Sequence, residues 1–330
     1  MKRNIIFMFL VLLTFKAGLG QTQTILSDEF KPAVFGILKT KAEFDLDNSK
    51  MRFEVRNARF GAKGKINPYF SYKVEIDLSD EGKVKSLDNY VKFTPVSNLD
   101  FYLGQRNIQF STDFVRSPAE NIFANRSFTA KYLNDGMRDI GFYANYRLPN
   151  LSFPLDITFG AVNGEGNNNP QWIDQPNLIG RVIAGHDNGF RLASNVYYGQ
   201  VVNRRYLAMF GEEIRYVSGN FFIESEYVNS NWTDTLRIRR QDDGMYIHSY
   251  YNFKLKNSMI SVLTPTARFD AMGFSVFEGS TEAQRVTFGL NTGFSPKQFT
   301  AEIRFNYEKY FKSSLPVETD KITLELIAVF

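Results

Sequence analysis

The sequence predicts an all-β fold, a transmembrane antiparallel β-barrel of about 16 strands. First, apolar and polar residues alternate with a period of two over most of the chain. Second, the alternating runs are about ten residues long, as a tilted membrane strand requires, whereas strands of soluble sandwiches usually have about five or six. Third, charged residues of both signs occupy the polar face of nearly every run, as a water-filled lumen allows.

The N-terminal residues predict a cleaved secretory signal peptide over residues 1–20. Lys2 and Arg3 precede an apolar run that ends at Phe15, and small residues follow at Gly18 and Gly20. The run is too short to span a bilayer comfortably as an anchor. We therefore expect residues 21–330 to form a single barrel domain that is exported to the bacterial outer membrane.

The charge balance gives no reason to expect a nucleic-acid partner. The full chain has 39 basic and 35 acidic residues and a net charge of +4. Residues 1–20 hold Lys2, Arg3 and Lys16 and no acid, so the mature chain has a net charge of +1. The basic character therefore belongs mostly to the segment that is removed.

The composition also argues against thiol chemistry and metal binding. The chain has no cysteine, which excludes disulfides, thiolate zinc sites and thiol nucleophiles. Its two histidines, His186 and His248, are far apart in sequence, and we expect each to be an ordinary strand or turn residue. We expect no metal site and no cofactor. No second apolar run approaches 20 residues, so helical membrane spans are not expected.

Four segments show the strand period best. In each of them five apolar or aromatic residues share one face, and in the first three the other face is mainly polar or charged. These segments are residues 70–79, 139–148, 299–308 and 321–330. The last one ends the chain on Phe330, and in a closed barrel it must pair with the first strand, which begins near Phe35.

The second strand, near residues 51–64, breaks its own period. Phe53 and Val55 share one parity, but Phe60 takes the other, so we expect a β-bulge near Asn57. With the bulge, four basic residues of this strand face the lumen; without it, one of the arginines lies at a rim of the barrel. These residues are Arg52 and Arg56 before the bulge and Arg59 and Lys63 after it.

The connections between strands are expected to alternate in length, as they do in bacterial outer-membrane barrels. Short turns are expected at residues 67–68, 95–98, 149–152, 187–189, 218–220, 256–258 and 295–297. Longer polar connections are expected at residues 80–85, 112–137, 163–177, 229–243, 271–284 and 312–320.

The stretch TDFVRSPAENIFANRSFTAK, residues 112–131, interrupts the alternation after the fifth expected strand. Structureless connections of this length are uncommon in compact domains and usually have a function. Five basic residues lie within or beside it, and Asp113, Glu120, Asp135 and Asp139 balance them in part. The five are Arg106, Arg116, Arg126, Lys131 and Arg138. The segment is long enough to reach into the lumen, where these residues would meet a solute.

Residues 51–166 resemble the phosphate-selective porins O and P. The resemblance is carried by FEVRNARFGAKGKINPYFSYKVEIDLS, SLDNYVKFTPVSNLDFYLGQRNIQF, NIFANRS and RDIGFYANYRL, in that order. It implies a trimeric channel of 16 strands whose third extracellular loop folds inward. In that family, arginines of the wall and basic loop residues guide phosphate through a constriction. By position, Arg56 and Arg59 match the arginine-bearing second strand, Asp88 an acid of the fourth strand, and Arg126 the arginine of the loop.

One departure from the family weakens the expectation of phosphate selectivity. The family has a lysine after the fifth strand, where this chain has Phe114, with Arg116 as the nearest base. In addition, acidic and basic residues nearly balance on the expected lumen face, and an anion filter needs a locally positive constriction. The acids are Glu75, Asp77, Asp88, Glu213, Glu224, Glu302 and Glu325, and the bases are Lys73, Lys92, Arg106, Arg147, Arg191, Arg285 and Arg304.

The expected function is passive diffusion of small hydrophilic solutes, with a possible preference for anions such as phosphate. No catalysis is expected, although an outer-membrane enzyme would require a nucleophile beside a base, for which the candidates are His186, or His248 with Ser249. A barrel that serves as a binding or structural protein without an open pore is the alternative. The expected partners are outer-membrane lipids, two further copies in a homotrimer, and small anions or other hydrophilic solutes. The expected pore residues are Arg56, Arg59, Asp88, Arg106, Arg116, Glu120, Arg126, Lys131 and Arg138.

Overall fold

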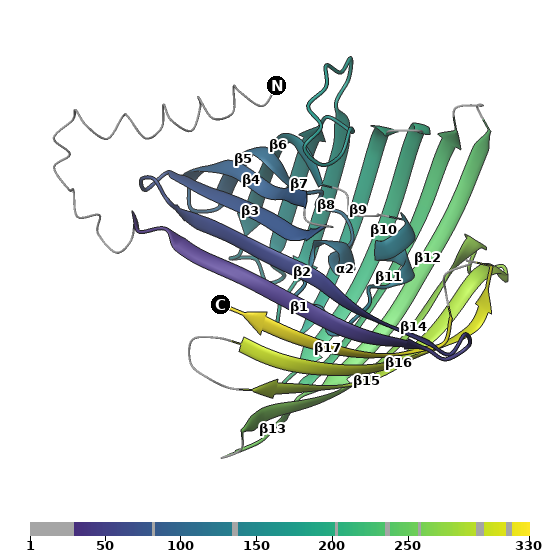
Figure 1. Ribbon diagram of the computed structural model, residues 1–330. Helices are drawn as coiled ribbons and strands as arrows, with labels where there is room; N and C mark the ends of the chain where they lie inside the picture. Colours follow the sequence, from purple (N-terminus) through teal and green to yellow (C-terminus); the bar gives the residue numbers. More distant parts are fainter. Residues whose placement is uncertain are drawn as a thin grey trace, which may run out of the picture. The chain divides into compact units, whose positions relative to one another are not determined.

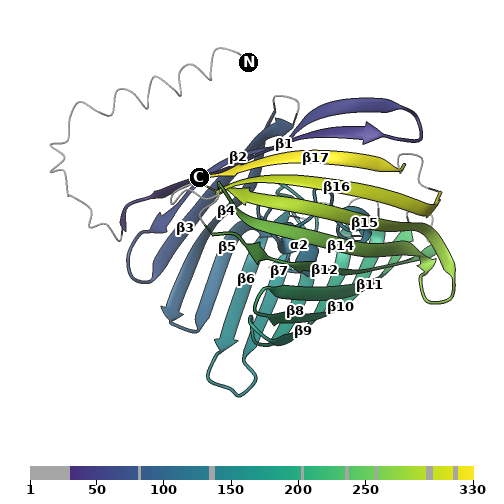
Figure 2. The same ribbon diagram turned by 90° about the horizontal axis from the view of Figure 1, so that it is seen from below.

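Sixteen antiparallel strands close into a barrel in which neighbours in sequence are neighbours in the wall (Figures 1 and 2). This computed structural model describes residues 30–80, 83–133, 138–201, 204–234, 238–256, 259–294, 300–314 and 319–330. The expected signal peptide lies outside the described residues. The fold class predicted from the sequence, an antiparallel barrel of 16 strands, is confirmed.

The first half of the wall is built from β1 (Ala33–Asp45), β2 (Lys50–Lys65), β3 (Phe70–Asp80), β4 (Lys83–Val96), β5 (Leu99–Asn107), β6 (Arg138–Leu148), β7 (Leu155–Val162) and β8 (Asn177–Gly185). The second half is built from β9 (Phe190–Val201), β10 (Arg204–Ser218), β11 (Phe221–Asp234), β12 (Arg239–Tyr251), β13 (Phe253–Lys254), β14 (Ile260–Ser275), β15 (Ser280–Phe294), β16 (Thr300–Ser313) and β17 (Lys321–Val329). Only Asn252 separates β12 from β13, and both pair with β14, so together they form one strand of the wall.

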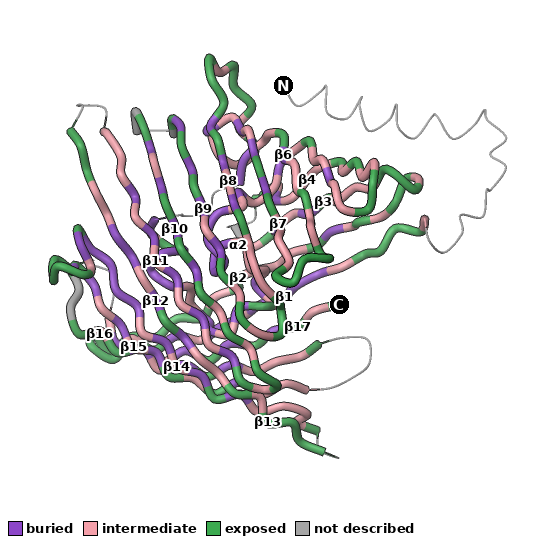
Figure 3. Tube along the Cα trace, turned by 180° about the vertical axis from the view of Figure 1, so that it is seen from behind, coloured by how far each residue is buried: buried purple, intermediate pink, exposed green. Residues whose placement is uncertain are grey.

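The wall is apolar outside and charged inside, the reverse of a soluble protein. Along β17, Leu324 and Leu326 are 42% and 49% exposed, whereas Thr323 and Glu325 between and beside them are fully buried. Buried and exposed residues alternate in this way along most strands of Figure 3. Because successive side chains of a strand point to opposite faces, this alternation gives a lipid-like exterior and a polar interior. None of the helices in the described residues is long and apolar enough to cross a membrane.

The barrel is closed by its first and last strands, as expected from the position of Phe330. The purple β1 lies beside the yellow β17 in Figure 1, with paired residues from Ile37 and Val329 to Asp45 and Lys321. The backbone groups of Gly36 and Phe330 exchange hydrogen bonds of 2.8 and 3.1 Å beyond this ladder. The Phe330 ring covers Gly36 so closely that a Cβ there would lie 2.2 Å from it, which explains the glycine.

The bulge expected in β2 is present and places the strand's basic residues as predicted. Lys39 of β1 pairs with Asn57, but the next residue of β1 pairs with Val55, so Arg56 is the extra residue. Arg52 and Glu54 therefore share the lumen face with residues that follow the bulge, such as Arg59.

Three of the six connections expected to be long are shorter in the structure. We call the rim that carries these six connections the long-loop rim and the opposite one the short-turn rim. Connections close to the expected length or longer lie at residues 108–137, 163–176 and 314–320, whereas residues 81–82, 235–238 and 276–279 replace the other three. The polar stretches expected as loops at 229–243 and 271–284 belong largely to strands, because their polar side chains face the lumen. For example, Asp243 accepts hydrogen bonds from Tyr227 and Asn229 across the wall.

Candidate functional site

The connection between β5 and β6 enters the barrel instead of capping it. It contains the short helix α2 (Thr112–Val115) and the π-helical turn η2 (Thr129–Leu133), and α2 lies inside the wall in Figures 1 and 2. We call residues 108–133 the inner loop. The third connection at the long-loop rim is thus the one that folds inward.

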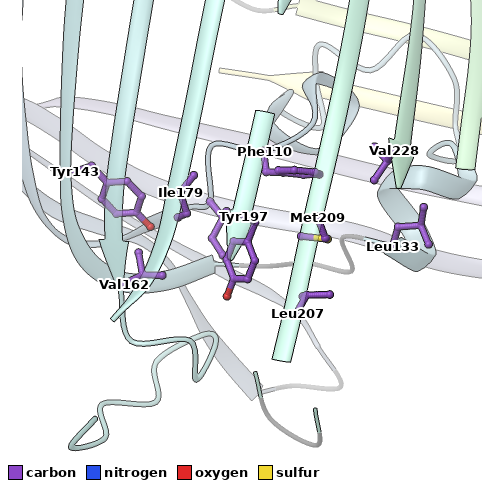
Figure 4. Packing of buried hydrophobic residues seen from close by; sticks show 10 residues of the cluster. Phe110, Leu133, Tyr143, Val162, Ile179, Tyr197, Leu207, Met209 and Val228 are labelled. Carbon is purple, nitrogen blue, oxygen red and sulfur yellow. The ribbon is translucent and has the colours of Figure 1, made fainter. Parts of the chain in front are cut away.

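The inner loop begins in an apolar cluster on the inner face of the wall (Figure 4). Ile108 and Phe110 are 1% and 0% exposed, and the side chains around them come from β6 to β11 and from η2. These side chains are Tyr143, Val162, Ile179, Tyr197, Leu207, Met209, Val228 and Leu133. Since each buried side chain of this size contributes about 1.5–3 kcal/mol, the cluster fixes the point at which the chain leaves the wall.

The middle of the inner loop is fixed mainly through its backbone carbonyl groups. Arginine and asparagine side chains of β14, β15 and β16 donate to them, and these strands supply acceptors for loop N–H groups as well. The donations are Arg304 to the carbonyl of Ala119 (3.0 Å), Asn291 to Ile122 (2.7 Å), Arg268 to Asn125 (3.0 Å) and Arg285 to Arg126 (2.8 Å). The N–H groups of Ala124 and Phe128 donate to Asn306 (2.7 Å) and Asp270 (3.0 Å). Hydrogen bonds to charged groups contribute about 1.5–3 kcal/mol each, so this loop segment is firmly seated.

Charged side chains anchor α2 to the opposite part of the wall. Arg116 donates to Glu224 of β11 at 2.8 Å, and Thr112 is bonded to both Glu213 and Arg181. Burial lowers the pKa of Arg116, but the Glu224 carboxylate outweighs it and raises the pKa above its ordinary value. The charge of Arg116 is therefore permanent at any pH that the folded protein experiences.

A second anchor lies within the inner loop itself. The Asp113 carboxylate accepts hydrogen bonds from the N–H (2.9 Å) and the hydroxyl (2.6 Å) of Ser127. Burial raises the pKa of Asp113, but the guanidinium groups of Arg126 and Arg116 outweigh it and hold the pKa below its usual range. Arg126 donates to the carbonyl groups of Asp113 and Arg116, and burial lowers its pKa to about 10. The two ends of the loop are thus tied to each other.

The inner loop and strands β1 to β4 enclose a cavity of about 580 Å³ toward the long-loop rim. We call it the long-loop cavity. Three acidic side chains line it, Glu43, Glu54 and Asp77, against twelve basic ones. The basic residues are Lys39, Lys41, Arg52, Arg56, Arg59, Lys85, Arg116, Arg126, Lys131, Arg138, Arg285 and Lys321. The sequence indicated a nearly neutral lumen, but the charged side chains that line this cavity are mostly basic.

The basic residues of the long-loop cavity differ in whether wall carboxylates neutralise them. Arg59 lies 3.2 Å from Asp77, and Lys39 lies 3.0 Å from Glu325. By contrast, Arg56 and Lys85 are exposed and form no ion pair within the part of the chain that the structure describes. The latter two therefore present their full charge to a solute.

A smaller cavity of about 350 Å³ lies on the other side of the inner loop, toward the short-turn rim. We call it the short-turn cavity. Strands β6 to β10 line it with polar side chains, among them Asn145, Asp156 and Arg181. Arg116 and Thr112 contribute from the inner loop, and Arg116 lines both cavities. The inner loop thus separates the two cavities, and the side chain of Arg116 borders both of them.

The structure brings most of the residues expected at the pore to one of these cavities. Arg56, Arg59, Arg126, Lys131 and Arg138 line the long-loop cavity, Glu120 lines the short-turn cavity, and Arg116 lines both. Asp88 lines neither cavity but pairs with Arg138 at 3.0 Å and Lys73 at 2.8 Å, so it positions a lining residue. Phe114, which stands near the position of the family's lysine, also lines the long-loop cavity.

Like Asp88, Arg106 is an expected pore residue that the structure does not bring to either cavity. Its guanidinium group lies over the rings of Tyr102, Tyr143 and Tyr90, at 4.2, 5.1 and 5.8 Å from their centroids. Cation–π contacts of this kind are favourable, so the side chain stacks on the wall and does not project into the path.

Several lining residues were not anticipated from the sequence. Lys39 and Lys41 of β1 line the long-loop cavity, and Arg181 and Arg215 line the short-turn cavity. The signal was present in β1, where the two lysines and Glu43 alternate with Leu38, Thr40 and Ala42. The sequence could not show that Arg181 and Arg215 line a cavity. The alternation of the strand identifies the residues that face the lumen, but not the parts of the lumen that the inner loop leaves open.

The geometry removes the pair considered for catalysis. His248 is buried between the rings of Phe222 and Tyr246, which stack on it at 5.4 Å. Ser249 follows it in a β-strand and so points to the other face of the wall. No group of side chains that could hold a metal ion occurs among the described residues.

Comparisons with known proteins agree with this geometry. No curated protein matches the sequence. Among solved structures, the trimer form of in-vitro folded OmpT of Vibrio cholerae has a TM-score of 0.62 at 11% identity, covering 92% of this chain and 100% of its own. The anion-selective porin from Comamonas acidovorans has a TM-score of 0.62 at 9% identity, covering 91% and 99%. The outer-membrane channel DcaP of Acinetobacter baumannii has a TM-score of 0.61 at 13% identity, covering 91% and 97%. At these identities the likeness shows the fold.

A family match supplies the rest of the comparison. Residues 38–176 match the family of phosphate-selective porin O and P. The matched range contains β2 with its bulge, the inner loop and most of the basic residues of the long-loop cavity. The resemblance seen in residues 51–166 is therefore confirmed: this part of the chain resembles the phosphate-selective porins O and P, and the whole barrel has the fold of the outer-membrane porins.

Proposed function

We propose that the chain is an outer-membrane porin, a passive channel for small hydrophilic solutes that favours anions over cations. The observation that carries the proposal is the long-loop cavity, where twelve basic side chains oppose three acidic ones beside the inner loop. Fixed charge at a constriction sets the local concentration of permeating ions, so a positive constriction favours anions. The similarity to an anion-selective porin fold is in keeping with this proposal.

Phosphate is one of the anions that we propose as solutes. The match to the phosphate-selective porins supports it, as do Arg56, Arg59 and Arg126 at the long-loop cavity. Phe114 lines the cavity near the position where the family has a lysine, so one donor for a phosphate oxygen is absent there. We therefore propose general anion preference, with less discrimination between phosphate and chloride than that family shows.

The same proposal includes the surroundings of the channel. The porin-like barrel and its apolar exterior support a location in the bacterial outer membrane, in contact with lipid. The expected signal peptide over residues 1–20 would direct export before cleavage. We also propose a homotrimer, because a trimer form is found for the similar OmpT barrel.

Purified protein in a planar lipid bilayer tests the proposal. Single-channel steps in potassium chloride are expected, and a salt gradient should give a reversal potential on the anion side. The same measurement in potassium phosphate gives the relative permeability of phosphate and chloride. A reversal potential that favours potassium would refute anion preference but leave the channel intact.

A barrel without an open pore is the second candidate, and the inner loop gives a reason to consider it. The loop fills the part of the lumen next to β8 to β16, where Phe110 and Phe128 are fully buried. The long-loop cavity on the other side is what makes conduction the better proposal. Protein that inserts into bilayers as folded trimers yet shows no conductance would favour the binding or structural role.

A further inference from the structure

The short-turn cavity holds a cluster of arginines that the proposed constriction does not use. Arg181, Arg191 and Arg215 come from the neighbouring strands β8, β9 and β10, and Arg116 reaches the same space from the inner loop. Asp156 and Glu120 are the acidic residues in the lining. Glu120 is engaged by the N–H of Ser117 at 3.0 Å, and Asp156 by Asn145 at 2.7 Å. Four arginine side chains and two carboxylates thus line a cavity of about 350 Å³.

Two of these arginines are placed where repulsion is greatest. Arg191 and Arg215 are direct partners across the ladder of β9 and β10, and both line the cavity. Like charges directly opposite each other in a sheet destabilise it. Asp187, in the turn before β9, lies 3.6 Å from Arg191 and 3.0 Å from Arg215. Its side chain is 91% exposed, so it is a weak counterion that an incoming anion can displace.

The third arginine has hydrogen-bonding capacity to spare. The Arg181 side chain is only 4% exposed, and its Nη2 donates to Thr112 at 2.6 Å and to Glu213 at 3.2 Å. Its Nε and Nη1 are buried without a hydrogen-bond partner among the described residues. Buried donors without acceptors are costly, so a turn of the Arg181 side chain toward an oxyanion in the adjoining cavity would be favoured, because the oxyanion supplies acceptors.

We propose that the short-turn cavity is a second anion-binding site, which we call the station. In it, the side chains of Arg181, Arg191 and Arg215 bind the anion. Its ligand is a small oxyanion with a phosphate or carboxylate group, because guanidinium groups pair best with such oxygens. When the anion is absent, Asp187 forms ion pairs with Arg191 and Arg215. When the anion binds, it displaces the Asp187 carboxylate. This inference rests on the proposed function, since the anion must first pass the long-loop cavity.

The position of Arg116 gives the station its place in the path. Arg116 lines both cavities, so an anion that leaves the first meets this guanidinium group before it meets the second cluster. Conduction requires sites that bind well enough to admit an ion and weakly enough to release it, and serial sites satisfy both conditions. The station therefore provides an intermediate binding site for an anion that moves from the long-loop cavity to the short-turn rim.

The test measures single-channel conductance of the full-length protein in bilayers against the concentration of potassium phosphate. In Arg191→Gln/Arg215→Gln, the concentration that gives half-saturation is expected to rise about tenfold, as the loss of one strong charged contact implies. In Asp187→Asn, the competing carboxylate is removed, and the half-saturating concentration should fall. Asp187 lies in an exposed turn, so this second variant does not depend on the tolerance of the wall.

Arg147→Gln is the matched control. Arg147 lies on β6 at the same rim and pairs with Asp100 at 3.0 Å, but it does not line the cavity. If the double variant and Asp187→Asn both behave like this control while the wild type remains anion-selective, the station is refuted and the proposed function stands. If the wild type does not conduct anions, the proposed function fails and the station fails with it.

Discussion

Arg116 Nη2 lies 2.8 Å from Glu224 Oε1, and this buried ion pair joins the inner loop to the far wall of the barrel. The same guanidinium group lines both cavities, so one residue anchors the loop and also contributes charge to the path. The two roles can be separated, because only the first requires Glu224. Substituting Arg116 alone removes both the charge and the anchor, whereas substituting Glu224 as well leaves no unpaired buried carboxylate.

Arg116→Gln is expected to lower both stability and anion preference. Glu224 is 1% exposed and would be left buried without its partner, which costs about 3 kcal/mol. Adding Glu224→Gln should restore most of the free energy of unfolding but not the ion selectivity. Urea unfolding in detergent and reversal potentials measure the two effects. Recovery of selectivity in the double variant would contradict a direct role for the Arg116 charge.

Arg56→Gln is expected to reduce anion preference without loss of stability. Arg56 is exposed at the bulge of β2 and lines the long-loop cavity, and it forms no ion pair in the described parts of the chain. A unit charge about 8 Å from an ion in water interacts by about 0.5 kcal/mol, so the permeability ratio should fall about twofold. Lys63→Gln, on the same strand and face but outside the cavity, is the control and should leave the ratio unchanged.

Asp270→Ala is expected to release the inner loop. Asp270 is fully buried, accepts from Phe128 N–H at 3.0 Å and pairs with Arg268 and Arg285, which hold loop carbonyls. Its removal leaves two buried guanidinium groups without that partner, at a cost of about 3–5 kcal/mol. Single-channel records should show a larger and noisier conductance. Asp174→Ala, in the exposed connection before β8, should behave like the wild type.

Acid is expected to loosen the inner loop only at a pH below the usual pKa range of carboxyl groups. Because the folded-state pKa of Asp113 is depressed, its stabilisation is complete above the unfolded pKa, about 3.9, and is lost as pH falls through the lower folded value. Conductance and selectivity should therefore stay constant from pH 7 to about 5 as far as this group is concerned. Asp113→Asn should reproduce the acid state at pH 7, with a loss of about 2 kcal/mol. A change of conductance at pH 6 in the wild type but not in Asp113→Asn would contradict this assignment.

The sequence predicted the wall well, because a barrel wall obeys a local rule. Parity alone assigned Leu324 and Leu326 to the exterior and Glu325 to the lumen, and a parity break predicted a bulge near Asn57, where the structure has Arg56 as the extra residue. The same rule failed near residues 229–243. Polar residues there were interpreted as a loop, although Asp243 faces the lumen from within β12.

The candidate site was harder to predict, because it depends on where the inner loop lies. Arg285 and Arg304 were expected as lumen charges, and Arg285 does line the long-loop cavity, but both donate to carbonyl groups of the loop and pair with carboxylates of the wall. Arg106 stacks on tyrosine rings, whereas Lys39 reaches the cavity. The loop contacts of Arg285 and Arg304 join residues 159 and 185 positions apart in the chain, which no local period encodes.

The inner loop is held to β14, β15 and β16 mainly by its carbonyl groups, which every amino acid possesses. Substitutions at its solute-facing side chains therefore leave most of that attachment in place. The inner loop therefore tolerates substitutions of side chains that face the solute, whereas substitutions of the wall side chains that hold its carbonyl groups would loosen it. Evolution, or a protein engineer, could thus alter which compounds pass through the barrel by exchanging a handful of side chains such as Phe114 without redesigning the strands that carry them.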